Sequence, residues 1–371
     1  MNKIFIVAGE VSGDRLAAWY VKRLRAHQQT DLYFEAVGGA SLQAEGVKLF
    51  EHLTALNVAG LVEIVRHLPS IMRFMRRLSD YIITHDFDTV VVVDFPGFNL
   101  RLIKQLKQRK PELKIIYLSP PQLWCWGAWR VRTLKKYTDQ VMVLYPFEVE
   151  WYRNRGVTVT WDGSPVYEML APYREQKVEK TLCIALIPGS RNSEIITMLP
   201  LFLHTAALLL ARHPELSFVL PVAPSMDRDV LKKIAQQHNL LSVWEKVMCV
   251  SDEREKFMHL TQCCCALSKP GTVSLELALL RVPTVIAFKV SWLTYLLARL
   301  FVRVKVMGLP NLLLDAIVAP EIIQFKCRPD VLAREVEMLY DEFVTQSESY
   351  HQRMNNLKKL ADMFSTKDRA L

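Results

Sequence analysis

The apolar residues of this chain fall into short unbroken runs of strand length, each followed by apolar and polar residues at helical spacing. Unbroken apolar runs are typical of strands buried on both faces of a parallel sheet. Strands that alternate with helices predict doubly wound α/β domains. The predicted strands are residues 3–8, 33–37, 88–93, 114–118 and 141–144, then 182–187, 217–221, 247–250, 264–267 and 283–288.

The chain has room for two such domains, because 371 residues is more than twice a typical domain of about 150 residues. The polar stretch 171–180 has the composition of a linker. We therefore expect an N-terminal Rossmann-like domain at residues 1–170 and a C-terminal one at 171–345. Residues 346–371 are expected to form a C-terminal helix that packs back or mediates association.

The stretch from Leu182 to Glu194 (LCIALIPGSRNSE) joins a strand, a tight Pro-Gly turn and a helix start. Backbone N–H groups at such a turn, together with the helix dipole, favour an anion. Arg191 adds a planar guanidinium that suits phosphate, and Ser190 or Asn192 is suited to cap the helix. The stretch predicts a phosphate or diphosphate site, and the alternative is an ordinary junction with a surface arginine.

Asp94 follows the apolar run 88–93 and precedes a Pro-Gly turn. Open parallel sheets bind ligands at the carboxyl ends of their strands. A carboxylate there is suited to take a proton from an attacking hydroxyl. The alternative is that Asp94 caps the helix beginning near Leu100, a role that Asn99 also suits.

Glu10 and Ser12 follow the first strand, where the same argument favours contact with a ligand. The loop lacks the GxGxxG pattern of dinucleotide-binding folds. The alternative is a plain turn in which Ser12 or Asp14 caps the helix from about Arg15.

Residues 61–83 combine large apolar side chains at helical spacing with four arginines. A basic amphipathic helix predicts contact with an anionic membrane surface, and the alternative is a surface helix whose apolar stripe faces the core. The aromatic and basic stretch 291–306 leaves the same two interpretations open. The residues expected at the membrane are Arg66, Arg73, Phe74, Arg76 and Arg77.

Trp124, Trp126 and Trp129 crowd a loop that leads into a basic helix. Aromatic rings beside cations suit the stacking of nucleobases, and they equally suit the anchoring of a loop in the core. In the second half, Glu276 lies in the first turns of a helix. Its carboxylate is suited to accept two ribose hydroxyls, or it merely offsets the helix dipole.

The net charge of +9, from 47 basic and 38 acidic residues, favours an anionic partner: nucleic acid, membrane or phosphorylated substrate. The 7 cysteines lack the spacing of a disulfide framework or a metal site, so we expect buried thiols in a reducing compartment. The sequence has no signal-peptide pattern and no apolar run long enough to span a membrane. These features favour a cytoplasmic location.

Taken together, several motifs resemble the lipid A disaccharide synthase family. The motifs are VAGEVSGD at 7–14, DFPGFN at 94–99, WCW at 124–126, PGSR at 188–191, SKPGTVSLE at 268–276 and LPNLL at 309–313. They occur in the family's order, at similar spacing, over nearly the whole chain. Two departures concern the loops: Pro121 is an extra residue and Gly127 stands where the family usually has a basic residue, while SKPGT replaces the family's SGT.

The resemblance implies a GT-B fold, with two Rossmann-like doubly wound domains facing a central cleft. It implies an inverting hexosyltransferase, independent of metal and cofactor, in lipid A (lipopolysaccharide) biosynthesis. The enzyme would join UDP-2,3-diacylglucosamine to 2,3-diacylglucosamine 1-phosphate (lipid X) by a β-1,6 linkage and release UDP. It would be peripheral on the cytoplasmic face of the inner membrane, would bind no nucleic acid, and would associate as a homodimer through its C-terminal part.

The resemblance also implies residue roles. Asp94 is the expected general base for the acceptor 6-hydroxyl, and Arg191 is expected to stabilise charge on the departing UDP. The expected substrate and nucleotide contacts are Glu10, Ser12, Gly189, Ser190, Gly271, Thr272, Glu276, Asn311 and Gln324.

Three other functions compete with this one. Another GT-B enzyme of UDP-sugars, an epimerase or a membrane-lipid glycosyltransferase, would share the nucleotide half but lack apolar acyl-binding surfaces. A nucleic-acid-binding protein that uses the tryptophan loop would bind with a steep dependence on salt and would not need Asp94. A peripheral membrane protein with an inactive nucleotide fold is disfavoured by Asp94 and Arg191.

Overall fold

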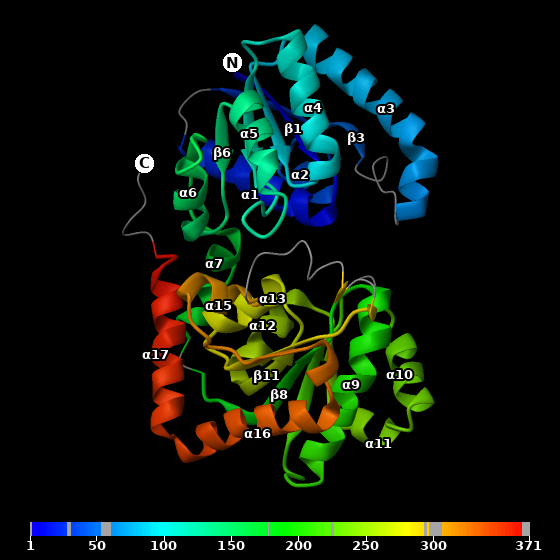
Figure 1. Ribbon diagram of the computed structural model, residues 1–371, viewed down its shortest axis with the longest axis vertical. Coiled ribbons are helices and arrows are strands. Elements are labelled where there is room, and N and C mark those ends of the chain that lie inside the picture. Colours follow the sequence, from blue (N-terminus) through cyan, green and yellow to red (C-terminus); the bar gives the residue numbers. More distant parts are fainter. Residues whose placement is uncertain are drawn as a thin grey trace. The chain divides into compact units, whose positions relative to one another are not determined.

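The computed structural model describes residues 2–27, 31–52, 61–176, 178–223, 226–292, 295–296 and 306–365, without the side chains of 61–68. The described residues divide after Pro165 into two compact units, unit 1 before that point and unit 2 after it (Figure 1). Each unit contains one parallel sheet with helices on its faces. The predicted α/β class is therefore confirmed, with the strand–helix alternation that the apolar runs indicated.

Unit 1 has a 7-stranded sheet in the order β3-β2-β1-β4-β5-β6-β7, and all its strand pairs are parallel. The strands are β1 (Asn2–Ala8), β2 (Leu32–Gly38), β3 (Lys48–His52), β4 (Thr89–Val93), β5 (Lys114–Leu118), β6 (Gln140–Met142) and β7 (Val159–Thr160). The helices are α1 (Val11–His27), α2 (Ala40–Ala44), α3 (Leu61–Thr84), α4 (Pro96–Arg109), α5 (Val131–Tyr137) and α6 (Pro146–Arg153). The valines of β4 are fully buried, because helices cover both faces of the sheet.

Unit 2 has a 6-stranded parallel sheet in the order β10-β9-β8-β11-β12-β13. The strands are β8 (Thr181–Ile187), β9 (Ser217–Pro221), β10 (Val247–Val250), β11 (Cys263–Ser268), β12 (Thr284–Phe288) and β13 (Glu321–Ile323). Its longer helices are α9 (Asn192–Leu210), α10 (Arg228–Gln237), α12 (Glu253–Gln262), α13 (Thr272–Leu279), α16 (Pro329–Thr345) and α17 (Glu348–Asp362). The short helices are α7 (Pro165–Met169), α8 (Ala171–Arg174), α11 (Leu241–Trp244) and α15 (Leu309–Leu314).

The strand order reverses once in each sheet. Each reversal lies between two neighbouring strands, and the loops that follow these strands are candidates for ligand binding. In unit 1 the chain winds outward from β1 to β3 and then returns to β4 on the other side of β1. In unit 2 the corresponding neighbours are β8 and β11. Loops at the carboxyl ends of such strand pairs diverge and leave a site for ligands. The loops are 9–10 and 94–95 in unit 1, and 188–191 and 269–271 in unit 2.

Several predicted boundaries are wrong. The strands β3, β7 and β13 were missed, because all three are edge strands with half-exposed residues and no unbroken apolar run. Helix α1 begins at Val11, and α4 begins at Pro96 after Phe95, earlier than expected in both cases. The expected linker 171–180 contains the short helix α8.

Helix α9 is, among the described residues, the one long and apolar enough to cross a membrane by length and composition. Half of its apolar window is buried inside unit 2, where Phe202 and Leu203 pack into the core beside β8 and β9. At the end of the chain, α17 packs against α13, α15 and α16.

Candidate functional site

Asp94 stands at the carboxyl end of β4 in a left-handed backbone conformation, with φ 47°, and Phe95 after it has φ 44°. Two successive non-glycine residues with positive φ are uncommon, and such strain persists where the surroundings enforce it. Here Tyr117 Oη donates to the Asp94 carbonyl at 2.8 Å, and Asn99 Nδ2 donates to the same carbonyl at 2.8 Å. The side chains of Tyr117 and Asn99 thus hold the sharp turn through its main-chain carbonyl. The half-buried Asp94 carboxylate is not used for these two bonds.

Gly9 makes the close approach of this turn to the first strand possible. A Cβ atom at Gly9 would lie 2.7 Å from the Phe95 ring, too close for any side chain. Because β1 and β4 pair in register up to Ala8 and Val93, the loops that carry Glu10 and Asp94 leave neighbouring strands. The structure therefore brings these two predicted residues to one edge of one sheet.

Electrostatics favour Asp94 as a base. Burial raises the pKa of the Asp94 carboxyl above its ordinary value, and the nearby Glu10 charge raises it further, against a lowering hydrogen bond from the Phe95 N–H. A raised pKa makes the carboxylate a better proton acceptor near neutral pH. Glu10, in the loop after β1, and Ser12, in the first turn of α1, are both exposed.

Asp14 has a role different from the predicted one. It lies inside α1 rather than capping it, and its side chain is 2% exposed. Its carboxylate accepts the N–H groups of Gly39 and Ser41 at 2.7 and 2.8 Å, so it holds the start of α2. No local sequence pattern indicates this contact, because its partners lie 25 and 27 residues away.

In unit 2 the PGSR turn joins β8 to α9, and α9 begins at Asn192 with Arg191 as its N-cap. The expected side-chain cap from Ser190 or Asn192 is wrong. Instead, Glu194 in the first turn accepts the N–H groups of Ser190 and Arg191 at 3.1 and 3.3 Å. The turn's first N–H groups are therefore held by a carboxylate, while the side chain of Arg191 is exposed.

Lys269, which sequence reasoning did not single out, lies at the same switch point. Its Nζ is 2.6 Å from Glu194 Oε1, and its backbone N–H donates to Ile187 at the end of β8. Gly189 has φ 132°, and a Cβ there would lie 3.0 Å from Lys269 Cδ and closer still to Glu194. Burial acts to raise the pKa of Glu194, but the Lys269 ammonium and the turn N–H groups outweigh it and hold that pKa below its ordinary value.

The loop after β11 ends at Gly271, and the helix α13 that follows it contains Thr272 and Glu276. Gly271 has φ 138° and precedes α13, which begins at Thr272; both residues are exposed. Glu276 Oε2 accepts from Lys256 Nζ at 2.8 Å. Both side chains of that ion pair are mostly buried, so the pair fixes the carboxylate in place.

Asn311 is 1% exposed and its amide is fully engaged within the chain. Its Nδ2 donates to the Ala319 carbonyl and to Glu321 Oε1, each at 2.7 Å. Its Oδ1 accepts from the N–H groups of Val318 and Ala319. A side-chain amide has two donor hydrogens and two acceptor lone pairs, so this geometry gives Asn311 a positioning role in the chain.

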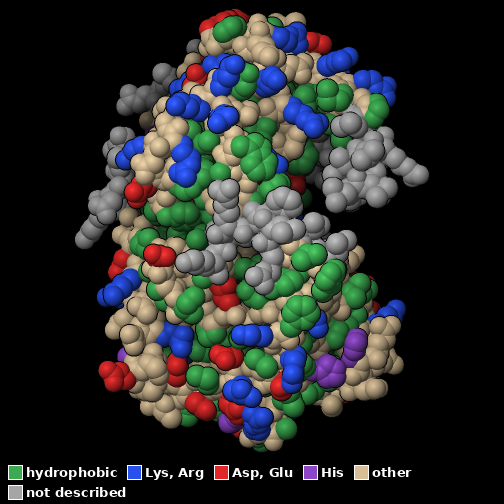
Figure 2. Space-filling model, in the orientation of Figure 1, with side chains coloured by type: hydrophobic (Ala, Val, Ile, Leu, Met, Phe, Trp, Pro, Cys, Tyr) green, Lys and Arg blue, Asp and Glu red, His purple; other side chains and the backbone are tan. Residues whose placement is uncertain are grey.

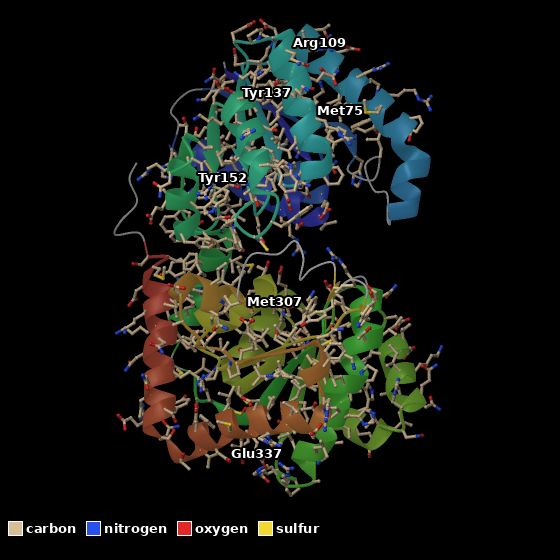
Figure 3. The ribbon with its side chains drawn as sticks, in the orientation of Figure 1. Met75, Arg109, Tyr137, Tyr152, Met307 and Glu337 are labelled. Atoms are coloured by element: carbon tan, nitrogen blue, oxygen red, sulfur yellow. The ribbon has the colours of Figure 1, made fainter. Side chains whose placement is uncertain are left out.

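Gln324 and Glu321 complete the same edge of the sheet. Gln324 has φ 55°, and its amide pairs with the backbone of Val290 in both directions, at 3.1 and 2.9 Å. Glu321, which the sequence did not mark, accepts the N–H groups of Met307 and Gly308 at the start of α15. Figure 3 labels Met307 at this position. These contacts hold Val290 after β12, and Met307 and Gly308 before α15.

The tryptophan loop has both a buried and an exposed part. Trp124 Nε1 donates to Glu148 Oε1 at 2.9 Å, and Tyr152, labelled in Figure 3, donates to the Pro121 carbonyl at 2.8 Å. These contacts anchor the loop, as one of the two interpretations expected. Trp126 and Trp129 are instead exposed.

The expected membrane residues lie on α3, which has an apolar face toward the core of unit 1, where Met75 is buried (Figure 3). Phe74 is half-buried, and its ring lies 6.1 Å from that of Phe98. Arg77 pairs with Glu51 at 2.6 Å, whereas Arg73 and Arg76 are exposed. The side chain of Arg66 and most of the stretch 291–306 lie outside the described residues.

Within the described part of the chain, no group of three or more His, Cys, Asp or Glu side chains is arranged to hold a metal ion. Cys263, Cys264 and Cys265 are buried as free thiols.

Comparison with known proteins gives one consistent family. The family model described as lipid-A-disaccharide synthetase matches residues 4–370. Lipid-A-disaccharide synthase 1 of Legionella pneumophila (strain Lens) is 36% identical over 98% of this chain and 94% of its own length. The lipid-A-disaccharide synthase of Myxococcus xanthus is 34% identical over 91% of this chain and 88% of its own.

Among solved structures, a UDP-GlcNAc 2-epimerase from Neisseria meningitidis bound to UDP-GlcNAc is similar in fold. It has a TM-score of 0.61 at 14% identity, over 97% of this chain and 98% of that chain. At this identity the likeness concerns the fold alone, and it confirms the predicted GT-B architecture.

Proposed function

The chain belongs to the lipid-A-disaccharide synthase family, and from this premise we propose how its residues carry out the reaction. Membership gives the activity: glycosyl transfer that forms the lipid A disaccharide in lipid A biosynthesis. The family implies UDP-2,3-diacylglucosamine as the donor and lipid X as the acceptor. The observation that carries the proposal is the strained, internally braced turn that presents Asp94 at the switch point of the first sheet.

Asp94 acts as the general base. Its carboxylate takes the proton of the acceptor 6-hydroxyl as that oxygen attacks the anomeric carbon of the donor sugar. The bond from this carbon to the UDP oxygen breaks as the new bond forms on the opposite face, so the configuration inverts. Burial and, after it, the neighbouring charge of Glu10 keep the Asp94 pKa raised, and Ser12 contacts the acceptor from the same edge.

The departing UDP carries the negative charge that develops during transfer. Gly189, Ser190 and Arg191 are proposed to bind its diphosphate, with the Arg191 guanidinium as the main cation. The N-terminus of α9 adds its dipole to the same site. Stabilisation of a leaving group by fixed positive charge is commonly a large catalytic contribution.

The nucleoside is proposed to bind at the loops after β11 and β12. Gly271 and Thr272 form the turn, and the Glu276 carboxylate, fixed by Lys256, accepts ribose hydroxyls. Asn311 and Gln324 are proposed to act indirectly. Their amides form hydrogen bonds within the chain itself and hold the neighbouring residues in place.

Peripheral association with the cytoplasmic face of the inner membrane is also part of the proposal. Arg73 and Arg76 on α3 support it because both are exposed. Figure 2 shows Lys and Arg side chains gathered over the displayed face of unit 1. Both proposed substrates carry acyl chains, so the enzyme is expected to meet them at a lipid surface. A homodimer remains the expectation of the family.

The direct test is an assay with UDP-2,3-diacylglucosamine and labelled lipid X in detergent micelles containing EDTA. The proposal predicts a disaccharide and one UDP for each disaccharide formed. UDP binding without a disaccharide would contradict the assigned substrates and would favour another UDP-sugar enzyme, such as an epimerase. Loss of activity in EDTA would contradict the metal-independent reaction.

A further inference from the structure

Two tryptophans in the loop after β5 remain exposed although the loop is firmly anchored. Trp126 is 45% exposed and Trp129 is 66% exposed. Their rings meet edge to face, with centroids 6.5 Å apart. Aromatic rings of this size normally contribute their area to a core. Two of them paired at the surface indicate contact with something outside the chain.

Arg130 lies over both rings. Its guanidinium carbon is 4.4 Å from the centroid of Trp126 and 5.8 Å from that of Trp129. Gly127, with φ 74°, supplies the left-handed backbone conformation of the turn that precedes Arg130. Arg130 thereby places a guanidinium over the turn that Gly127 makes.

The described residues do not neutralise the guanidinium of Arg130. No described carboxylate lies within ion-pairing distance of it, and no described residue accepts its hydrogen bonds. Stacking on an aromatic face leaves the N–H groups in the guanidinium plane available. That planar fork matches the oxygens of a phosphate. The loop thus holds an oriented and unpaired phosphate-binding group.

The loop lies beside the candidate base. Strand β5 is the direct neighbour of β4, so the loops after both strands leave the same edge of the sheet. Tyr117 of β5 donates to the Asp94 carbonyl. Burial raises the pKa of Tyr117 well above its ordinary value, and the Arg130 charge acts on the same hydroxyl in the opposite direction.

We propose that Arg130, held by Trp126 and Trp129, binds the phosphate of the acceptor lipid. This inference rests on the proposed function, in which the acceptor hydroxyl is activated at Asp94. An acceptor that carries a sugar phosphate needs a cation on the same sheet edge as the base. The indole faces beside Arg130 offer apolar surface to the sugar ring. The phosphate of a bilayer lipid has the same chemistry, and the experiment separates the two sources.

The test compares two acceptors at saturating donor: lipid X and 2,3-diacylglucosamine, which lacks the 1-phosphate. In Arg130→Met the preference in kcat/KM for lipid X falls roughly 10- to 100-fold, the range of a lost charged hydrogen bond. The KM for the donor stays unchanged, and Arg130→Lys recovers part of the preference. Arg155→Met is the matched control, because Arg155 also stacks on a tryptophan, 3.9 Å from the Trp151 ring, but donates to the Trp151 carbonyl.

The outcomes are distinguishable. If Arg130→Met keeps the wild-type preference, the assignment is overturned. If it keeps the preference but loses binding to phosphatidylglycerol vesicles, Arg130 binds bilayer phosphate and the proposal also falls. If the variant is inactive with both acceptors, calorimetric binding of lipid X decides, and unchanged affinity overturns the assignment. A wild-type enzyme that forms no disaccharide would refute the proposed function itself.

Discussion

The Lys269 ammonium lies 2.6 Å from the Glu194 carboxylate at the turn that joins β8 to α9. The same carboxylate accepts the N–H groups of Ser190 and Arg191. Without Lys269, a negative charge would stand at the turn where the diphosphate is proposed to bind. Lys269 therefore neutralises Glu194 and would supply further donors at the proposed diphosphate site.

Lys269→Met is expected to weaken UDP binding about 10-fold, the effect of one lost charged hydrogen bond at the low end of its range. Affinity for uridine, which lacks the diphosphate, should stay unchanged. Isothermal titration calorimetry with both ligands measures this, and Lys269→Arg serves as the conservative control. Equal losses for UDP and uridine would show that Lys269 supports the fold of the site instead.

The pH dependence of the reaction should report Asp94. Its pKa is raised by burial and by Glu10, and the base must be ionised to act. We therefore expect kcat/KM to fall as the pH drops through a value above the ordinary aspartate pKa of about 3.9. In Glu10→Gln the repulsion is removed, so the acid limb should move to lower pH. An acid limb at the same pH in this variant would contradict the coupling of Glu10 to Asp94.

Membrane contact should depend on the exposed residues Arg73 and Arg76 of α3. Each basic residue near an anionic surface contributes about 1 kcal/mol, so the Arg73→Ser/Arg76→Ser variant should bind phosphatidylglycerol vesicles roughly 30-fold more weakly. Sedimentation with vesicles measures this. Arg109→Ser is the control, because Arg109 is paired with Asp80 at 2.6 Å. Unchanged sedimentation of the double variant would exclude α3 as the membrane surface.

Glu148 should make the stability of unit 1 depend on pH. Burial raises its pKa from 4.5 to about 7, against hydrogen bonds from Trp124, Tyr145 and Leu144 that lower it. Between these values the unfolded chain releases the proton while the folded chain keeps it. The free energy of unfolding therefore falls as the pH rises from 4.5 to about 7, by on the order of 3 kcal/mol.

Urea unfolding at pH 5 and pH 8 checks this. The stability advantage of the wild type over Glu148→Gln should shrink as the pH rises. Glu150→Gln, at an exposed position on the same helix, is the control. A gap between wild type and Glu148→Gln that is equal at both pH values would show that Glu148 is ionised throughout the range.

Much of this fold could be predicted from the sequence, because a strand buried on both faces carries its own signal. The valines of β4 gave the central strand and, with it, the position of Asp94 at its end. Edge strands lack that signal, and β3 was missed because its residues are half-exposed.

Pairings between distant residues could not be predicted. Lys269 meets Glu194 across 75 residues, and only the adjacency of β8 and β11 brings them together. Asn311 shows the opposite case, since its polar side chain suggested a ligand contact. The structure uses that amide for Val318, Ala319 and Glu321, and no local pattern distinguishes the two uses.

The proposed reaction depends most on Asp94 as the general base, and the variant Asp94→Asn tests that role directly. The amide is nearly isosteric with the carboxylate but cannot accept the acceptor proton, so the rate of disaccharide formation should fall by about 10²- to 10⁴-fold. UDP affinity measured by calorimetry should stay at the wild-type value, since the PGSR turn and Glu276 lie in the other unit. Disaccharide formation within a few-fold of the wild-type rate would contradict the assignment of Asp94 as the general base.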